Sequence, residues 1–212
     1  MHLLFETFRG GLLFEVKNLK EAQMAENAGA VAVILNYDCS PIHNEGNAKI
    51  LEDILKNIQI PVISAFRAGH LVEAELLINI GVWGLYADSR LDKIYMPDYF
   101  SYLTEKDLPV IADIRNFNKK QEAFAPVIRN KSLKHIINKM KQPHLQNFVL
   151  AAGDIKTVSD VSLVRRVGYD GVIIDNEIFE LEKVEHHLEN LIKASFYYDQ
   201  SEELTKILSK IY

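Results

Sequence analysis

Acidic side chains recur within or directly after short apolar segments of this sequence, at positions where they could do chemistry. They are Glu15, Asp38, Asp88, Asp113, Asp154 and Asp175. If the segments are parallel strands, these carboxylates meet at one edge, where they could bind a hard cation or a cationic ligand or form an acid–base pair. The structural alternative is that aspartates at strand–helix turns cap helices and solvate loops. Because neither EF-hand spacing nor a His-x-x-x-His pair occurs, we expect no metal site.

The elements that must position these side chains are eight apolar segments alternating with amphipathic helices. A short repeat, a helix end followed by a glycine and a strand apolar on both faces, recurs at Gly29, Gly81 and Gly168. Strands buried on both faces and separated by helices indicate a parallel sheet. The predicted strands are Gly11–Val16, Val31–Leu35, Pro61–Ala65, Val82–Tyr86, Pro109–Ala112, Pro126–Arg129, Phe148–Ala151 and Gly171–Ile174.

Eight strand–helix units predict an α/β fold, a (β/α)8 TIM barrel, with an open doubly wound sheet as the alternative. The fifth unit is the weakest, because 118–124 leaves room only for a short helix. Thr157 with Asp160 three residues later predicts a capping box on the seventh helix. We expect one domain over residues 1–212, closed by a helix at about 199–211 with an apolar stripe, and Trp83 packed in the barrel.

Composition excludes several classes of protein. The chain has 212 residues, 48% of them apolar, which is enough for one sizeable core. A net charge of −5 argues against nucleic acid or an anionic membrane surface as the partner. The sequence has no signal-peptide pattern and no apolar run long enough to span a membrane. A single cysteine, Cys39, excludes an internal disulfide, and we expect a cytoplasmic protein.

One segment carries a specific resemblance. Residues 61–74 are PVISAFRAGHLVEA, which predicts a strand, a glycine turn and a helix. The segment resembles the third strand–helix unit of the PdxS/SNZ family, the synthase subunit of pyridoxal 5′-phosphate synthase, whose motif is Pro-Val-x-Ala-Lys-Ala-Arg-x-Gly-His-x-Val-Glu-Ala. Further matches are GGLLFEV at 10–16, AGAVAV at 28–33, AAG at 151–153 and DGV at 170–172. The resemblance covers almost the whole chain and implies a role in pyridoxal phosphate biosynthesis.

The departures from the family pattern fall where its chemistry should be. Ala65 stands where the family has the lysine that forms the Schiff base with the pentose phosphate. A methyl group cannot form an imine. Glu15 replaces the aspartate of the first strand, and Lys131 keeps the position of the family's second lysine, but the glycine-rich phosphate loop after it is missing.

The second phosphate position, after strands seven and eight, is also altered. It offers Gly153-Asp154 and Asp175-Asn176-Glu177 in place of glycine-rich turns. A carboxylate ~4 Å from a phosphate charge costs about 1 kcal/mol in water and ~4 kcal/mol at an effective dielectric of about 20. We therefore expect phosphate binding to be disfavoured there.

The resemblance yields the candidate site residues. Glu15 and Lys131 are the candidate catalytic residues, and Arg67, Asp88 and Gly153 the candidate substrate-binding residues. Each has a structural alternative. Lys131 could be an exposed lysine on a turn, Arg67 could pair with a carboxylate such as Asp88, and His70 could cap the third helix. No cofactor is expected.

Two hypotheses for the function follow. The first is a non-catalytic member of the PdxS/SNZ family that forms homo-oligomers smaller than the family's double ring, or co-assembles with an active synthase paralogue. The second is an active lyase or synthase of pyridoxal phosphate biosynthesis with a displaced lysine, or a barrel enzyme with altered chemistry on the acidic face. We expect the glutaminase partner not to bind, because the family's leading helix, on which it docks, is mostly missing from this sequence.

Overall fold

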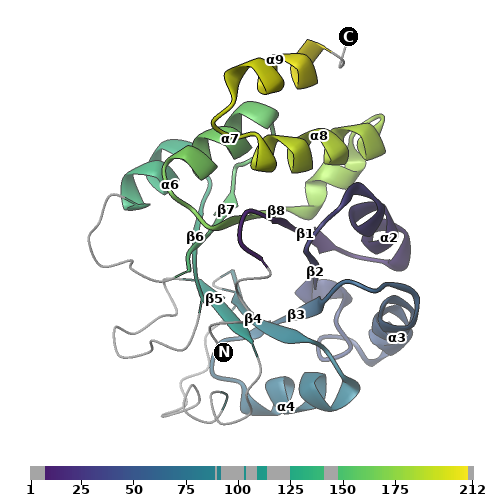
Figure 1. Cartoon of the computed structure of the whole chain (residues 1–212). Coiled ribbons are helices and arrows are strands. Elements are labelled where there is room, and N and C mark those ends of the chain that lie inside the picture. The colour runs from purple at the N-terminus through teal and green to yellow at the C-terminus, as the bar shows by residue number, and fades with distance from the viewer. Residues whose placement is uncertain are drawn as a thin grey trace.

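The computed structural model describes residues 8–88, 90–91, 103, 109–113, 125–140 and 148–209. Its eight strands form a closed parallel barrel in which each strand pairs with the next and β8 pairs with β1 (Figure 1). The TIM barrel prediction is confirmed, and closure by the β1–β8 pairing excludes the open sheet. The strands are β1 Leu12–Val16, β2 Ala32–Leu35, β3 Val62–Arg67, β4 Gly84–Asp88, β5 Val110–Asp113, β6 Ala125–Asn130, β7 Leu150–Gly153 and β8 Gly171–Ile174.

Alternate side chains of each strand belong to two separate apolar clusters, because successive residues of a strand point to opposite faces. The inner cluster fills the barrel and includes Leu13, Ile34, Ile63, Tyr86, Ile111, Val127, Leu150 and Ile173. The outer cluster packs the strands against the helices and includes Leu12, Phe14, Val33, Phe66, Leu85 and Val172. Burial on both faces explains why the strand segments are nearly continuous apolar runs.

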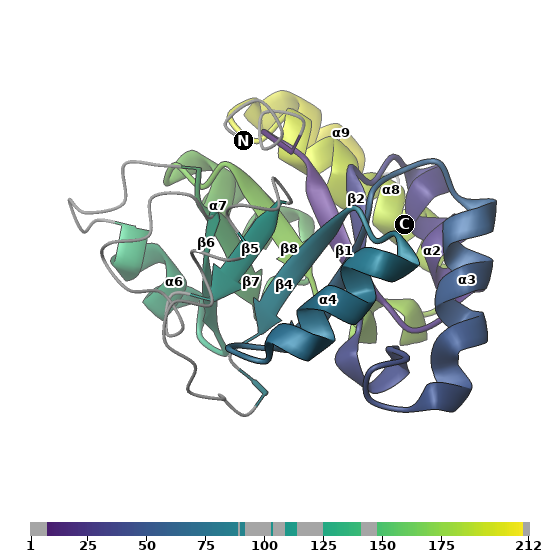
Figure 2. The same cartoon turned by 90° about the horizontal axis from the view of Figure 1, so that it is seen from below.

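Helices surround the barrel in chain order, as two perpendicular views show (Figures 1 and 2). They are α2 Leu19–Ala28, α3 Ala48–Asn57, α4 Leu71–Ile80, α6 Leu133–Met140, α7 Val158–Arg166 and α8 Val184–Phe196. Short 3-10 turns are η1 Tyr37–Cys39, η2 Glu45–Asn47 and η4 Asn176–Glu180. The short helix predicted at 118–124 lies outside the described residues.

The last described helix, α9 (Ser201–Ser209), contacts α8 outside the ring of helices (Figure 1). It begins and ends close to the predicted bounds. Of its predicted apolar stripe, Ile207 is buried, Leu204 is partly buried, and Leu208 is 41% exposed. Ile211, the last member of the stripe, lies outside the described residues.

Two helix starts follow the sequence prediction. Thr157 and Asp160 form a reciprocal capping box at α7, each side chain accepting a hydrogen bond from the other's backbone N–H. His70 is the N-cap of α4, where its Nδ1 accepts a hydrogen bond of 3.3 Å from the Glu73 N–H. No helix in the described part of the chain is long and apolar enough to cross a membrane.

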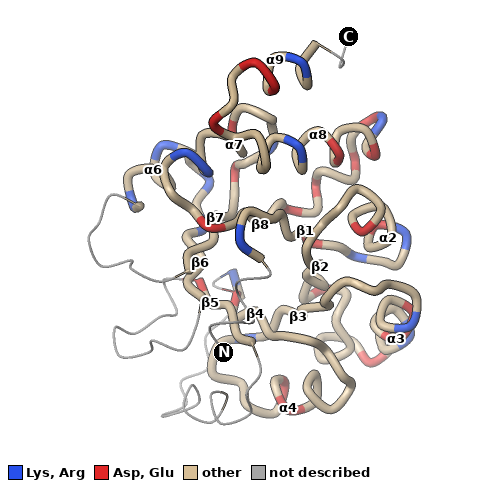
Figure 3. The backbone as a smooth tube through the Cα atoms, in the orientation of Figure 1, with Lys and Arg blue, Asp and Glu red and all other residues tan. Residues whose placement is uncertain are grey.

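Positive and negative side chains alternate around the outside of the barrel, with basic positions gathered on α6 (Figure 3). This mixture fits a chain whose net charge is only −5.

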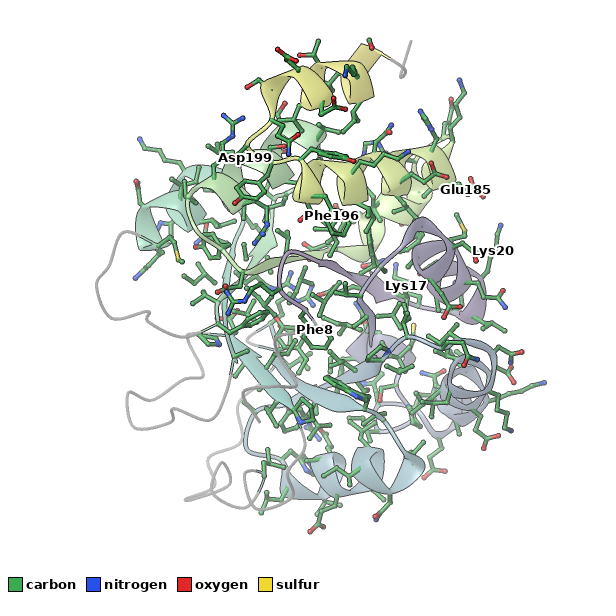
Figure 4. All side chains as sticks on the ribbon, viewed as in Figure 1. Phe8, Lys17, Lys20, Glu185, Phe196 and Asp199 are labelled. Carbon is green, nitrogen blue, oxygen red and sulfur yellow. The ribbon has the colours of Figure 1, made fainter. Side chains whose placement is uncertain are left out.

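Phe8 closes one end of the barrel. Its ring is fully buried, belongs to the inner cluster and meets the edge of Trp83 at 5.1 Å between centroids. In Figure 4 the labelled Phe8 lies within the ring of strands. Trp83, the sole tryptophan of the chain, packs against the same cluster, as the sequence predicted.

Phe8→Ala should therefore lower the free energy of unfolding by about 3–5 kcal/mol, because it removes a fully buried ring from a packed interior. Urea denaturation followed by the fluorescence of Trp83 would measure the change. Phe196→Ala is the matched control: this ring is 61% exposed, so the expected change is within about 0.5 kcal/mol. Equal effects of the two substitutions would contradict a sealing role for Phe8.

Candidate functional site

Charged side chains from four strand ends form one network at the carboxyl-terminal mouth of the barrel. Glu15 Oε1 accepts hydrogen bonds from Arg90 Nη2 at 2.7 Å and from Arg129 Nη2 at 2.6 Å. Arg90 Nε also binds Asp88 Oδ2 at 2.8 Å, and Arg129 Nη1 binds Asp175 Oδ1 at 2.5 Å. These contacts link β1, β4, β6 and the segment after β8, which are far apart in the sequence.

Glu15 is the centre of this network and its most buried carboxylate. Its side chain is 1% exposed, whereas that of Arg90 is 39% exposed. Oε2 of Glu15 is buried and has no hydrogen-bond partner among the described residues. Burial raises the pKa of the Glu15 carboxyl above its usual value, against the opposing charges of Arg129 and Arg90. A buried carboxylate oxygen without a donor is uncommon and marks a position where a ligand or a proton can bind.

Tyr86 supports the network from inside the barrel. Its hydroxyl accepts a hydrogen bond of 3.1 Å from Arg129 Nε, and the guanidinium lies 5.8 Å from the ring centre. Tyr86 is fully buried and pairs in register with Ala65 on the neighbouring strand. The volume beside the methyl group of Ala65 is thus bordered by a neutral aromatic ring.

A second polar cluster explains the motif from Arg67 to Glu73. The buried Glu73 carboxylate accepts hydrogen bonds from Arg67 Nε at 2.6 Å, from the Arg67 backbone N–H at 3.0 Å and from the Tyr37 hydroxyl at 3.3 Å. His70 Nε2 lies 3.6 Å from the same carboxylate. The cluster fastens the end of β3 to the first turn of α4, so the motif has a structural role here.

Arg67 binds a carboxylate, as its structural alternative states, but this carboxylate is not that of Asp88. The carboxylate bound to the guanidinium of Arg67 is Glu73, six residues further on. Asp88, although it pairs with Arg67 in register, binds both Nε and Nη2 of Arg90. Arg90 follows Asp88 by only two residues, and this proximity favours the local pair.

A cavity of about 620 Å³ opens beside the network, between the ends of β1, β7 and β8. Its lining includes Lys17, Gly153, Lys156, Asp175 and Glu177. Gly153 has a φ of +116°, and a Cβ there would lie 2.0 Å from the backbone oxygen of Asn130. The candidate substrate-binding glycine therefore also permits a close approach of β6 and β7.

Several backbone amides near this cavity are bound by the chain itself. The N–H groups of Lys156 and Thr157 both donate to Asp160 Oδ2, at 3.2 and 3.0 Å, and the N–H of Asp160 donates to Thr157 Oγ1 at 3.1 Å. The N–H of Ile155 donates to the Gly153 carbonyl at 2.7 Å. Amides at a helix start often bind phosphate in such barrels, and here the capping box takes up part of them.

The remaining acidic strand ends do not join into a cation site. Asp154 is half exposed and lies 3.8 Å from Lys156, while Asp113 is buried at the end of β5. Asp38 is exposed, and its N–H is bound by the Asn36 side chain. No group of three or more His, Cys, Asp or Glu side chains within the described residues could hold a metal ion.

Lys131 lies apart from the charged network. Its side chain is exposed on the turn between β6 and α6, where Ser132 N–H binds Asn130 Oδ1 at 2.9 Å. Within the described part of the chain it has no hydrogen bond or ion pair. Its role as a catalytic residue stays a prediction.

The sequence reasoning missed Arg90, Arg129 and Tyr86 as members of the mouth. The signal for Arg129 was present, because it ends a predicted strand as the acidic residues do. Tyr86 also ends a predicted strand, but its partner Arg129 is 43 residues away, and Arg90, which lies beyond the strand, reaches Glu15 across 75 residues. These partners could not be read from the local sequence.

The sequence pattern of the SOR/SNZ family matches residues 2–89. The pyridoxal 5′-phosphate synthase subunit PdxS of Staphylococcus epidermidis is 26% identical over 261 aligned positions, which cover 97% of this chain and 87% of that protein. PdxS of Thermoanaerobacter sp. is 27% identical over 259 positions, covering 96% and 87%. The chain is therefore similar to the SOR/SNZ (PdxS) family, at about 26% identity over nearly its whole length. At this distance, the shared scaffold does not carry the activity with it.

Two solved structures of differently named proteins share this fold. Thiamine phosphate pyrophosphorylase from Pyrococcus furiosus superposes with a TM-score of 0.66 at 14% identity, covering 92% of this chain and 98% of that one. The Amycolatopsis orientalis BexX/CysO complex gives 0.66 at 15% identity, covering 95% and 92%. These likenesses support the TIM barrel fold alone.

Glu15→Gln should lower the free energy of unfolding by about 3 kcal/mol, because it removes the buried negative charge that Arg90 and Arg129 share and leaves Arg129 paired with Asp175 alone. Chemical denaturation monitored by circular dichroism would measure this. Glu189→Gln, which breaks an exposed pair with Lys193 on α8, is the control and should cost less than about 0.5 kcal/mol. An equally small effect at Glu15 would show that the network does not hold the strands together.

Tyr86 predicts a loss of stability at alkaline pH. Burial raises its pKa above the ordinary value of 10.0, so the unfolded chain releases the phenolic proton first. The contribution of the buried, neutral Tyr86 to the free energy of unfolding is fully present below pH 10.0. It falls as the pH rises further, by about 1.4 kcal/mol per pH unit for one tyrosine.

Tyr86→Phe should remove this share of the alkaline slope in urea denaturation between pH 9 and 11, at a cost of about 1 kcal/mol near neutrality for the lost hydrogen bond. Tyr197→Phe, at a 40% exposed position, is the control and should leave the slope unchanged. An unaltered slope in Tyr86→Phe would contradict the assignment.

Proposed function

We propose that this chain is a non-catalytic homologue of the pyridoxal 5′-phosphate synthase subunit, acting as a structural or regulatory partner of a related barrel. The observation that carries the proposal is the environment of Ala65. Its methyl group is 2% exposed in the barrel interior, at the position of the family's Schiff-base lysine. None of the eight strands contains a lysine.

The state of the phosphate positions supports the same proposal. The N–H groups of Thr157 and Asp160 at the start of α7 are taken up by the capping box, and the cavity beside them is lined by Asp175 and Glu177. A pentose phosphate would meet carboxylates where it needs free N–H donors. Loss of the amine and of the anion site together favours loss of the synthase reaction over a change in its substrate.

An exposed apolar stripe supports the assembly part of the proposal. Val72, Leu76 and Ile80 follow one another at four-residue spacing along α4 and are 56%, 49% and 40% exposed. Apolar side chains that line one face of a helix are unfavourable in water and are typical of contacts between proteins. We propose that this face binds a second barrel, either a copy of this chain or an active synthase paralogue.

An active enzyme is the second candidate, and one observation favours it. Burial raises the pKa of Glu15, and its free Oε2 could exchange a proton with a ligand. In that case Glu15 would be the acid–base group, and Lys131 or the acidic mouth would supply the remaining chemistry. The exposure of Lys131 argues against its use as a buried amine nucleophile.

Incubation of the purified protein with ribose 5-phosphate followed by borohydride reduction should give no covalent adduct by intact-mass spectrometry. Ala65→Lys should also yield no pyridoxal phosphate when pentose phosphate, triose phosphate and ammonia are supplied, because the anion sites are missing as well. A lysine-bearing synthase subunit is the positive control. An adduct or product from the unaltered chain would overturn the proposal in favour of the active enzyme.

Light scattering should show an oligomer for the unaltered chain, and a mixed species when it is co-expressed with a lysine-bearing synthase subunit. Leu76→Asp should shift the mass towards the monomer, because a charge cannot be buried in an apolar contact without a partner. Leu163→Asp on α7, a 40% exposed leucine away from the stripe, is the control and should leave the mass unchanged. A monomeric unaltered chain that forms no mixed species would contradict the assembly.

A further inference from the structure

We propose that the cavity between the ends of β1, β7 and β8 binds a neutral polyhydroxy compound, a free sugar or polyol that carries no phosphate. This inference deepens the proposed function and rests on it in one respect: the ligand is bound and not converted. Three features of the cavity support this ligand class: its open polar groups, its apolar wall and its balance of charge.

The polar groups that remain open suit hydroxyls. Among the described residues, the Lys17 ammonium has no ion-pair or hydrogen-bond partner, and Asp175 uses only Oδ1 to bind Arg129. Asn176 also lines the cavity without a side-chain hydrogen bond to the described residues. An ammonium donates, a carboxylate oxygen accepts and an amide does both, so this set can satisfy hydroxyl groups that donate and accept.

The rest of the wall is apolar. Ile155, Ile174, Ile178 and Leu181 line the same cavity and could pack against the C–H surface of a sugar ring or polyol chain. The volume of about 620 Å³ falls within the range of small-molecule sites. An apolar wall with a few open polar groups is the usual composition of such sites.

The charges argue against an ionic ligand of either sign. Asp175, Glu177 and Glu180 oppose an anion, and Lys17 opposes a cation. Lys156, the other cation of the wall, is held by Glu177 at 3.1 Å and lies 3.8 Å from Asp154. The capping box also takes up the N–H groups of Thr157 and Asp160 at the start of α7, which reduces the donors left for a phosphate. A neutral ligand avoids all of these costs.

The test compares two ligands that differ only in a phosphate group. Binding of ribose and of ribose 5-phosphate to the full chain would be measured by ligand-observed NMR titration, together with xylitol and myo-inositol. We expect at least one neutral compound to bind with a Kd of about 1 mM or below, and ribose 5-phosphate to bind about tenfold more weakly than ribose or not at all.

Two variants locate the site, each with a matched control. Lys17→Met should weaken binding of the neutral compound about tenfold, whereas Lys20→Met, on α2 and further from the barrel in Figure 4, should not change it. Glu177→Gln should strengthen ribose 5-phosphate binding and leave the neutral compound unaffected. Glu182→Gln, the same charge change at an exposed position outside the cavity lining, should do neither.

Circular dichroism of each variant verifies that it is folded. Failure of every neutral compound to bind, tighter binding of ribose 5-phosphate than of ribose, or an unchanged affinity in folded Lys17→Met would each overturn the inference. None of these outcomes affects the absence of imine chemistry, which the adduct experiment tests separately. Conversely, a covalent adduct would overturn the proposed function whatever the titration gives.

Discussion

The mouth of this barrel depends on one interaction, the contact of the buried Glu15 carboxylate with the guanidinium groups of Arg90 and Arg129. Removing a carboxylate from water is costly, and only opposite charges and hydrogen bonds at short distance can offset that cost. Oε1 has two such contacts, at 2.7 and 2.6 Å. Through them, β1 is joined to β4 and β6, and through Asp175 to the end of β8. Strands that do not touch each other are therefore coupled by charge.

The same network bears on the residue at position 65. Arg129 and Arg90 already supply two positive charges to this part of the mouth, and Tyr86, which binds Arg129, pairs in register with Ala65. A lysine at position 65 would bring a third positive charge and a longer side chain towards a space bordered by a buried ring. The alanine, the tyrosine and the arginines are physically consistent with one another.

The sequence predicts the scaffold well and the mouth poorly, for physical reasons. Strands that are apolar on both faces, such as 171–174, can be predicted from local composition, and so can the helix cap formed by Thr157 and Asp160. Glu15 and Asp175 could be expected at the strand ends for the same reason. The partner of a charged residue cannot be predicted from local sequence in this way. Arg129 lies 114 residues from Glu15. Arg67 binds Glu73 and not Asp88, because the start of α4 brings Glu73 close to it. The register of the strands and the closure of the barrel determine these contacts.

The capping box of α7 has a consequence for protein engineering. Asp160 accepts hydrogen bonds from the N–H groups of Lys156 and Thr157, and Thr157 accepts one from Asp160. Freeing these amides for an anion would require loss of the cap, at a cost of about 1 kcal/mol before any ligand binds. A design that places an anion at this helix start must therefore add stability elsewhere in the barrel.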